Sequence, residues 1–180
     1  MRLLFTMLAL PVLVGAQTAS EQYKAGRTAM SVNNTELAIR AFERAVELDD
    51  RNAEYHLWLG RAVGSRALAA NSYQQPFLAR RARSEFERAV QLDPASVGAR
   101  EGLLQFYLNA PGVIGGSLEK ARQQAAEIGK LSKLRGHLAL ANIANREKEL
   151  ATAEREYRAA IADAPDSSVA SVALANYLQS

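Results

Sequence analysis

The chain has 180 residues, enough for one domain with a sizeable core, and it contains no cysteine, which excludes disulfides, thiolate metal sites and cysteine nucleophiles. Lysine and arginine outnumber aspartate and glutamate by 22 to 19, and a net charge of +3 is too small to indicate nucleic-acid binding. Hydrophobic residues make up 48% of the chain but aromatic residues only 7%, a composition that suits closely packed, alanine-rich helices.

The first 16 residues have the pattern of a secretory signal peptide. Arg2 supplies a positive charge, residues 3–14 form an apolar run, and Gly15 and Ala16 provide small residues for cleavage before Gln17. The apolar run is shorter than the ~20 residues that a membrane-spanning helix needs. We therefore predict a bacterial protein that is periplasmic or secreted, with no stable membrane insertion after the segment is removed.

Three segments of the remaining chain share one layout. They are Ala38–Asp50, Ala82–Pro94 and Ala153–Pro165, which read AIRAFERAVELDD, ARSEFERAVQLDP and AEREYRAAIADAP. Alanines and one aromatic residue recur at intervals of three and four, which places them on one face of a helix. A layout that recurs along a chain is the sequence signature of a repeat protein. This one resembles the second helix of a tetratricopeptide repeat.

The resemblance implies an all-α fold, a right-handed α-solenoid of stacked helix–turn–helix hairpins over residues 17–180. Counting back from each terminal aspartate or proline predicts repeats at 19–52, 53–96, 97–133 and 134–167, and then a lone helix at 168–180. A single hairpin cannot bury its apolar face, so neighbouring hairpins must stack to build a continuous core. We expect Phe42, Phe86 and Tyr157 each to fill the junction between their own hairpin and the next.

The first predicted repeat turns at Asn33-Asn34, whose short polar side chains suit a helix N-cap. Its second helix is expected over Glu36–Leu48. The residues expected to point inward are Leu37, Ala38, Ala41, Phe42, Ala45 and Val46.

The second and third predicted repeats depart from the 34-residue period. The second has about ten surplus residues around Ser65–Phe77, which predict longer helices, a turn near Asn71-Ser72 and a new helix starting at Pro76. The third has a loop at Asn109–Ser117 and then a helix from Leu118 to about Leu131, in which Ala125 replaces the aromatic residue of the other repeats.

Catalysis finds little support in the sequence. The two histidines, His56 and His137, are too far apart along the chain for a metal-binding pair, and packing or surface roles are expected for both. The glycines of the Asn109–Ser117 loop lack the Gly-Lys-Ser/Thr ending of a P-loop, so we interpret the loop as a permissive turn followed by an N-cap at Ser117. We predict a non-enzymatic protein without cofactor or metal.

The resemblance implies a protein or peptide partner, held in a concave groove lined by the first helix of each hairpin. Aromatic, aliphatic and arginine side chains are typical of peptide hot spots. An alternative is that Tyr23 and Trp58 only complete the packing between neighbouring first helices. The pattern of lysines and asparagines with which some relatives clamp a C-terminal carboxylate is absent. The candidate groove residues are Tyr23, Arg27, Leu57, Trp58, Arg61, Glu101, Gln105, Leu108, Leu138 and Asn142.

Three further surfaces are candidates. The segment Arg61–Arg83 contains no acid, so an anionic small ligand or envelope polymer is an alternative partner, with a patch at Arg66, Arg80, Arg81 and Arg83. Val113 and Ile114 in the loop either fold back onto their own hairpin or contact a partner. The helix 168–180 carries no charge, which predicts weak self-association or a partner contact.

Overall fold

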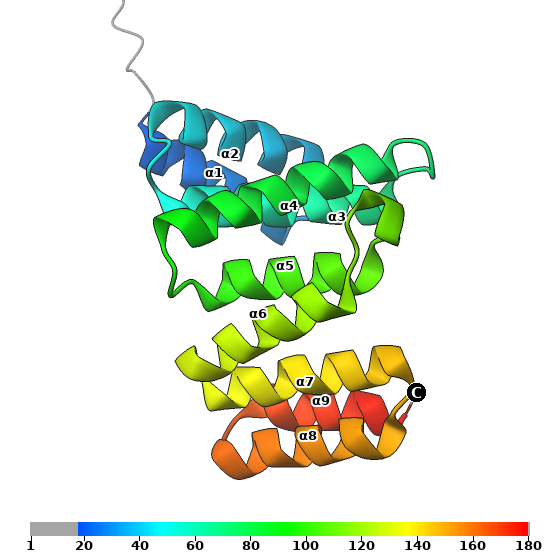
Figure 1. The fold of residues 1–180 in the computed structure, drawn as a ribbon. Coiled ribbons are helices and arrows are strands. Elements are labelled where there is room, and N and C mark those ends of the chain that lie inside the picture. The colour runs from blue at the N-terminus through cyan, green and yellow to red at the C-terminus, as the bar shows by residue number, and fades with distance from the viewer. Residues whose placement is uncertain (1–17, 180) are drawn as a thin grey trace, which may run out of the picture.

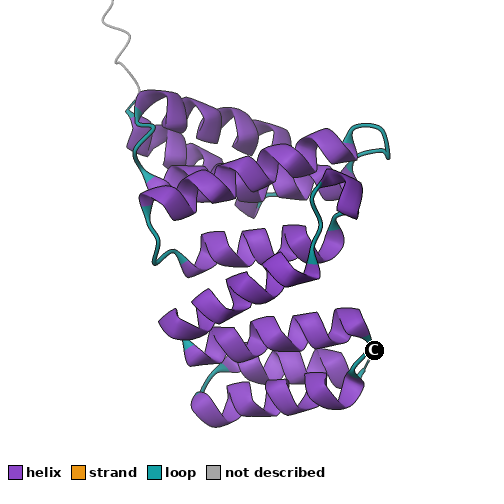
Figure 2. Cartoon of the chain, in the orientation of Figure 1, coloured by secondary structure: helices purple, strands orange, loops and turns teal. Residues whose placement is uncertain are grey.

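The structure is a computed structural model that describes residues 18–179, and these residues form helices and connecting loops without a strand (Figure 2). The predicted signal segment, residues 1–16, lies outside the described residues. The elements are α1 (Ala19–Ser31), α2 (Thr35–Leu48), α3 (Ala53–Ala69), α4 (Gln75–Leu92), α5 (Val97–Asn109), the 3-10 turn η1 (Gly112–Ile114), α6 (Leu118–Leu131), α7 (Lys133–Glu147), α8 (Leu150–Asp163) and α9 (Ser168–Leu178).

The helices pack as four hairpins that stack on one another: α1 with α2, α3 with α4, α5 with α6, and α7 with α8 (Figure 1). The first helices form one row, in which α1, α3, α5 and α7 contact each other in sequence and α9 contacts α7 and α8. We call α1, α3, α5, α7 and α9 the first-helix row, and α2, α4, α6 and α8 the second-helix row. The all-α stack of hairpins predicted from the sequence is confirmed. Within residues 18–179, no helix has the length and apolar character needed to cross a membrane.

Short polar side chains determine where most helices begin. At α1, Thr18 and Glu21 form a reciprocal capping box. Asn33 has a left-handed backbone (φ 56°), and Asn34 caps α2 by accepting a hydrogen bond from the Leu37 amide, as predicted. The same type of side-chain cap is provided by Asn52, Ser96, Ser117, Ser132 and Ser167.

The surplus residues of the second hairpin lengthen its helices, as predicted. Helix α3 has 17 residues and α4 has 18, compared with 13 and 14 in the first hairpin. Between them, the Asn71 side chain accepts hydrogen bonds from the amides of Tyr73 and Gln74 at 3.2 and 3.0 Å. Pro76 lies in the first turn of α4, where its missing amide costs no helical hydrogen bond.

Two phenylalanines fill the junctions between hairpins, as predicted, and glycines make the room. A Cβ atom added to Gly60 of α3 would lie 2.8 Å from the Phe86 ring, and one added to Gly102 of α5 would lie 2.6 Å from it. The ring of Phe86 therefore touches its own hairpin and the next. Phe42 sits in the same way against Gly26, and its ring centroid lies 6.1 Å from that of Trp58 on α3.

The remaining two hairpins solve this junction in different ways. Tyr157 of α8 packs on Tyr177 of α9, with ring centroids 5.2 Å apart, and its hydroxyl accepts a hydrogen bond from Asn145 at 3.0 Å. In α6, Ala121, Ala125 and Ile128 are buried as predicted, and no aromatic residue takes the central position. Instead α6 approaches α7 so closely that a Cβ on Gly136 would lie 2.5 Å from the Cα of Gly129.

One inward-facing residue of α2 was assigned wrongly. Leu37 is 47% exposed, whereas Ile39 is only 8% exposed and belongs to the core. The buried face of α2 is thus rotated away from Leu37 and toward Ile39, and its centre remains at Ala38, Phe42 and Ala45. A spacing of three and four residues predicts the centre of the buried face but not its edges. Contacts with α3 and α4 decide which edge is covered.

Candidate partner-binding surfaces

Five side chains of α1 and α3 form a compact group on the first-helix row, which we call the Trp58 cluster: Tyr23, Arg27, Glu54, Trp58 and Arg61. The indole of Trp58 lies beside two guanidinium groups, with the Cζ atoms of Arg27 and Arg61 at 3.8 and 4.7 Å from the ring centroid. Both distances are within the range of cation–π attraction.

Hydrogen bonds hold the cluster in place. Oε1 of Glu54 accepts from Nε1 of Trp58 at 2.7 Å and from the Tyr23 hydroxyl at 3.2 Å, and the Tyr23 oxygen accepts from Arg27 at 2.9 Å. Burial raises the pKa of Tyr23, so its hydroxyl stays protonated and able to donate at neutral pH. Within residues 18–179 neither Arg27 nor Arg61 has a carboxylate partner. The cluster therefore presents two guanidinium groups that form no ion pair, beside one carboxylate, and its net charge is +1.

A second surface lies further along the same row, between α5 and α7, and we call it the α5/α7 hollow. Its volume is about 290 Å³. Arg135 donates to Glu101 at 3.1 Å across it, which neutralises both charges. Apolar and amide side chains provide the rest of the lining, which comprises Glu101, Leu104, Gln105, Arg135, Leu138, Ala139, Asn142, Tyr157 and Ala173.

Eight of the ten predicted groove residues reach these two surfaces. Tyr23, Arg27, Trp58 and Arg61 belong to the Trp58 cluster, and Glu101, Gln105, Leu138 and Asn142 line the α5/α7 hollow.

The structure corrects the other two. Leu57 is buried against Gly98 of α5, where the missing side chain leaves room for it. Leu108 is buried in the core, and only its backbone carbonyl is used by another element, as acceptor for Arg146 at 3.0 Å. Both therefore stabilise the stack and do not line a surface.

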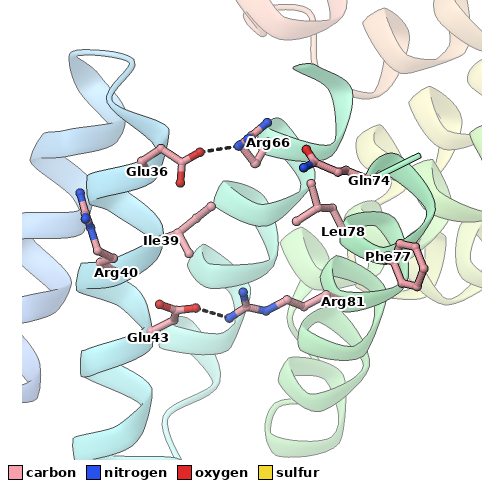
Figure 3. A pocket seen from close by; sticks show the side chains of 9 residues that line it. All are labelled: Glu36, Ile39, Arg40, Glu43, Arg66, Gln74, Phe77, Leu78 and Arg81. Carbon is pink, nitrogen blue, oxygen red and sulfur yellow. Dashed lines mark hydrogen bonds and ion pairs between the residues drawn. The ribbon is translucent and has the colours of Figure 1, made fainter. Parts of the chain in front are cut away.

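A third surface, which the sequence reasoning missed, lies on the second-helix row between α2 and α4, and we call it the α2/α4 groove (Figure 3). Its volume is about 490 Å³. Helix α2 contributes residues at positions i, i+3, i+4 and i+7, and α4 contributes residues at the same spacing counted from its N-cap, so each set lies along one face. The lining comprises Glu36, Ile39, Arg40 and Glu43 of α2, Arg66 of α3, Gln74 at the N-cap of α4, and Phe77, Leu78 and Arg81 of α4.

Two ion pairs cross the α2/α4 groove. Arg66 pairs with Glu36 near one end, and Arg81 pairs with Glu43 near the other (Figure 3). Ile39 and Leu78 lie between the two pairs and form an apolar centre. The sequence signals for this groove were the surplus of residues in the second hairpin and the arginines Arg66 and Arg81. Their partners could not be anticipated, since the two pairs join residues 30 and 38 positions apart.

The four arginines of the predicted anionic patch do not act as one group. Arg66 and Arg81 are neutralised by the α2 acids described above. Arg80 donates to the Val113 carbonyl of the α5–α6 loop at 3.5 Å. The Arg83 guanidinium lies beside Gly115 of that loop and 5.3 Å from the Phe106 ring centroid on α5, and its Nε pairs with Glu87 at 3.4 Å. The segment lacks acids in sequence, but the fold supplies them from α2.

The two apolar residues of the α5–α6 loop differ in exposure, so each one fits a different alternative: folding back onto the hairpin or facing outward toward a partner. Val113 is 89% exposed, whereas Ile114 is half-buried. Gly115 adopts φ 109°, which favours glycine, and it also leaves room for the Arg83 guanidinium. Ser117 then caps α6 by accepting from the Lys120 amide at 3.3 Å. The predicted turn with an N-cap is confirmed.

Both histidines connect the two helices of a hairpin. Buried His56 has Nδ1 at 2.7 Å from Glu85 and Nε2 at 3.1 Å from the Asp50 carbonyl, and the hydrogen bond to Glu85 raises its pKa. His137 lies 2.8 Å from Glu156 and 3.4 Å from Asp163. Over the described part of the chain, no group of three or more histidine, cysteine, aspartate or glutamate residues is arranged to hold a metal ion.

The stacked hairpins place the chain among the helical-repeat proteins, and comparisons with known proteins narrow this class. Residues 23–75 match the family model of the tetratricopeptide repeat. No sequence among the curated proteins matches the chain.

Several solved structures share the fold. TTC0263, a thermophilic TPR protein of Thermus thermophilus, is 19% identical, with a TM-score of 0.77 over 91% of this chain and 83% of that one. PilF of Pseudomonas aeruginosa is 18% identical, with a TM-score of 0.66 over 89% and 68%. YrrB, described as a TPR protein with an unusual peptide-binding site, is 21% identical, with a TM-score of 0.61 over 86% and 73%. The chain therefore has the fold of tetratricopeptide repeat proteins.

Proposed function

We propose that this protein is a non-catalytic scaffold that binds a peptide segment of a partner protein along its first-helix row. The observation that carries the proposal is the pairing of two surfaces on that row, the Trp58 cluster on α1 and α3 and the α5/α7 hollow further along. The peptide-binding description of YrrB, which shares the fold, supports the same function.

The two surfaces differ in chemistry, which indicates how a peptide would be oriented. Arg27 and Arg61 carry unpaired charges and favour a carboxylate, while the charges of Glu101 and Arg135 cancel each other. The α5/α7 hollow therefore favours an apolar side chain, with Gln105 and Asn142 available to bond the peptide backbone. A stable interface needs such central anchors surrounded by contacts that exclude water.

Selection from a random peptide library tests this function. Binding of a selected peptide, measured by calorimetry, should weaken at least about tenfold in both Trp58→Ala and Leu138→Ala, because each removes a central anchor. Arg158→Ala on α8 is the control, since this exposed arginine pairs only with Glu154 and lies on neither surface. Selected peptides whose affinity survives both substitutions would contradict the proposal.

We also propose that the scaffold works in the bacterial cell envelope. The support is the charged, apolar and small-residue pattern of residues 1–16. A tagged precursor should appear in the periplasmic or secreted fraction with its mass reduced by the signal segment. Recovery at full mass in the cytoplasm would contradict export and leave the peptide-binding function untouched.

The alternative function, capture of an anionic ligand by Arg61–Arg83, has weaker support. Glu36 and Glu43 already occupy Arg66 and Arg81, and Arg80 and Arg83 face a different loop. An anion would have to displace three ion pairs to gather these guanidinium groups, since Arg83 also pairs with Glu87.

A further inference from the structure

The α2/α4 groove lies on the second-helix row, apart from the surface on which the proposed function rests. It depends on the surplus residues of the second hairpin, because Arg66, Gln74 and Phe77 come from this segment. The same segment carries exposed apolar side chains: Tyr73 is 82% exposed and Phe77 66%, and their ring centroids lie 6.5 Å apart. Large apolar side chains gathered on a surface mark interaction sites.

We propose that the α2/α4 groove is a second docking site, for a peptide segment of a partner that carries a large apolar side chain next to a carboxylate. The apolar part of the site is the centre formed by Ile39 and Leu78, with Phe77 at its α4 edge (Figure 3). The ion pairs of Glu36 and Glu43 bound this centre seven residues apart on α2, or about 10 Å. That spacing accepts one aromatic or long aliphatic side chain between the pairs.

Charge complementarity is the reason for expecting a carboxylate in the docked peptide. Three arginines and two glutamates line the groove, and each glutamate is paired with one arginine. Arg40 is left as the one lining arginine without a carboxylate, which gives the groove a net charge of +1. Its side chain lies along the α2 edge, with the guanidinium turned away from Leu78 (Figure 3). Because no partner holds it there, it is free to fold over a carboxylate bound beside the apolar centre.

N-acetyl-phenylalanine is a minimal probe, since it joins one aromatic side chain to one carboxylate, and N-acetyl-phenylalanine amide is its uncharged match. Both would be titrated into ¹⁵N-labelled protein while backbone amide shifts are followed. The carboxylate probe should shift amides of residues 36–43 and 74–81 in a saturable way and bind about threefold more tightly than the amide, as expected for one exposed ion pair.

Two variants test the two parts of the site. Arg40→Gln should bind the carboxylate probe no better than the amide, and Arg44→Gln is the matched control, because Arg44 is one turn away and pairs with Glu47 at 2.9 Å. Phe77→Ala should weaken both probes by at least about threefold, whereas Leu150→Ala, an exposed apolar control on α8, should change neither. Trp58→Ala should also change neither, which separates this site from the proposed peptide surface.

Either of two results would overturn the proposal. One is equal binding of the carboxylate and the amide by the unchanged protein, which would show that Arg40 does not select the charge. The other is a pattern of shifts that lies outside residues 36–43 and 74–81 or persists undiminished in Phe77→Ala.

Discussion

The junctions at Phe86 and between α6 and α7 use glycine in opposite ways. Around Phe86, Gly60 and Gly102 stand back so that a large ring fits between α3 and α5. Between α6 and α7, Gly129 and Gly136 face each other, and the two backbones approach without a ring between them. Glycine thus makes room for a side chain at one junction and for a helix backbone at the other. The number of repeats alone does not say which solution a junction uses.

Phe86→Ala tests the first junction and should have the largest effect on the free energy of unfolding. Removing the ring leaves a cavity lined by two glycines, which cannot fill it, and the expected loss is about 3–5 kcal/mol of unfolding free energy. Urea denaturation followed by circular dichroism measures it. Phe77→Ala is the matched control, because that ring is exposed and its loss should cost less than about 0.5 kcal/mol. Equal urea midpoints for Phe86→Ala and the unchanged protein would show that the Phe86 ring does not fill this junction.

Gly136→Ala tests the other junction. The new Cβ would lie 2.5 Å from the Cα of Gly129, and because that atom is backbone, the helices must separate. We expect a loss of about 1–3 kcal/mol in the same denaturation experiment. The control is Gly64→Ala, where the nearest atom to a new Cβ is 3.9 Å away. There the better helix propensity of alanine should stabilise the protein by about 0.5–1 kcal/mol. If both variants are stabilised, α6 and α7 are not in close backbone contact.

The α3/α4 hairpin that contains Phe86 should also depend on pH through His56. Its pKa is raised in the folded state by the hydrogen bond to Glu85, with a smaller contribution from the Asp50 carbonyl and opposition from burial and Arg88. A raised folded pKa means that the added stability is fully present below the unfolded value of about 6.5 and is lost as pH rises through the folded value.

Glu85→Gln keeps a hydrogen-bond acceptor but removes the charge, so it should reduce this dependence. Urea denaturation at pH 6.0 and 8.5 measures the effect. The unchanged protein should exceed the variant in stability by more at pH 6.0 than at pH 8.5. The same difference at both pH values would show that the His56–Glu85 contact does not depend on the proton.

The smallest effect that we expect is a weak self-association through α9, at the C-terminal end of the stack. Val169, Val172 and Leu178 of α9 are exposed, and the helix has no charge. We expect weak, concentration-dependent self-association in sedimentation equilibrium, and we expect Val172→Asp to abolish it. A monomer over the whole concentration range would contradict self-association through α9.

Much of the stack follows from the sequence because its determinants are local. The spacing of alanines around Phe42, Phe86 and Tyr157 identifies the packed face, and Asn34 and Ser117 identify helix starts. Predictions were wrong where a neighbour decides. Leu37 and Ile39 lie on opposite edges of one face, and Leu57 is buried because Gly98 of another hairpin receives it.

The three candidate surfaces also differ in whether the sequence could predict them. The Trp58 cluster and the α5/α7 hollow could be anticipated from the positions of residues on the first helices. The α2/α4 groove could not, because the pairs of Glu36 and Glu43 with Arg66 and Arg81 join different hairpins. Opposite charges that lie far apart in sequence become partners only when the stacking brings the helices together.

Helix α7 has two buried faces that belong to different cores. Ala139 and Ile143 join the large cluster that runs from α1, whereas Ala141 and Ala144 join a small cluster with Ala153 and Tyr157. Because the small cluster is separate from the large one, we expect the C-terminal end of the stack to open more readily than the rest. Amide hydrogens of α8 and α9 should exchange with solvent together, and sooner than those of α3 and α5. This molecule would then lose its C-terminal end reversibly under mild denaturation, before the global transition begins.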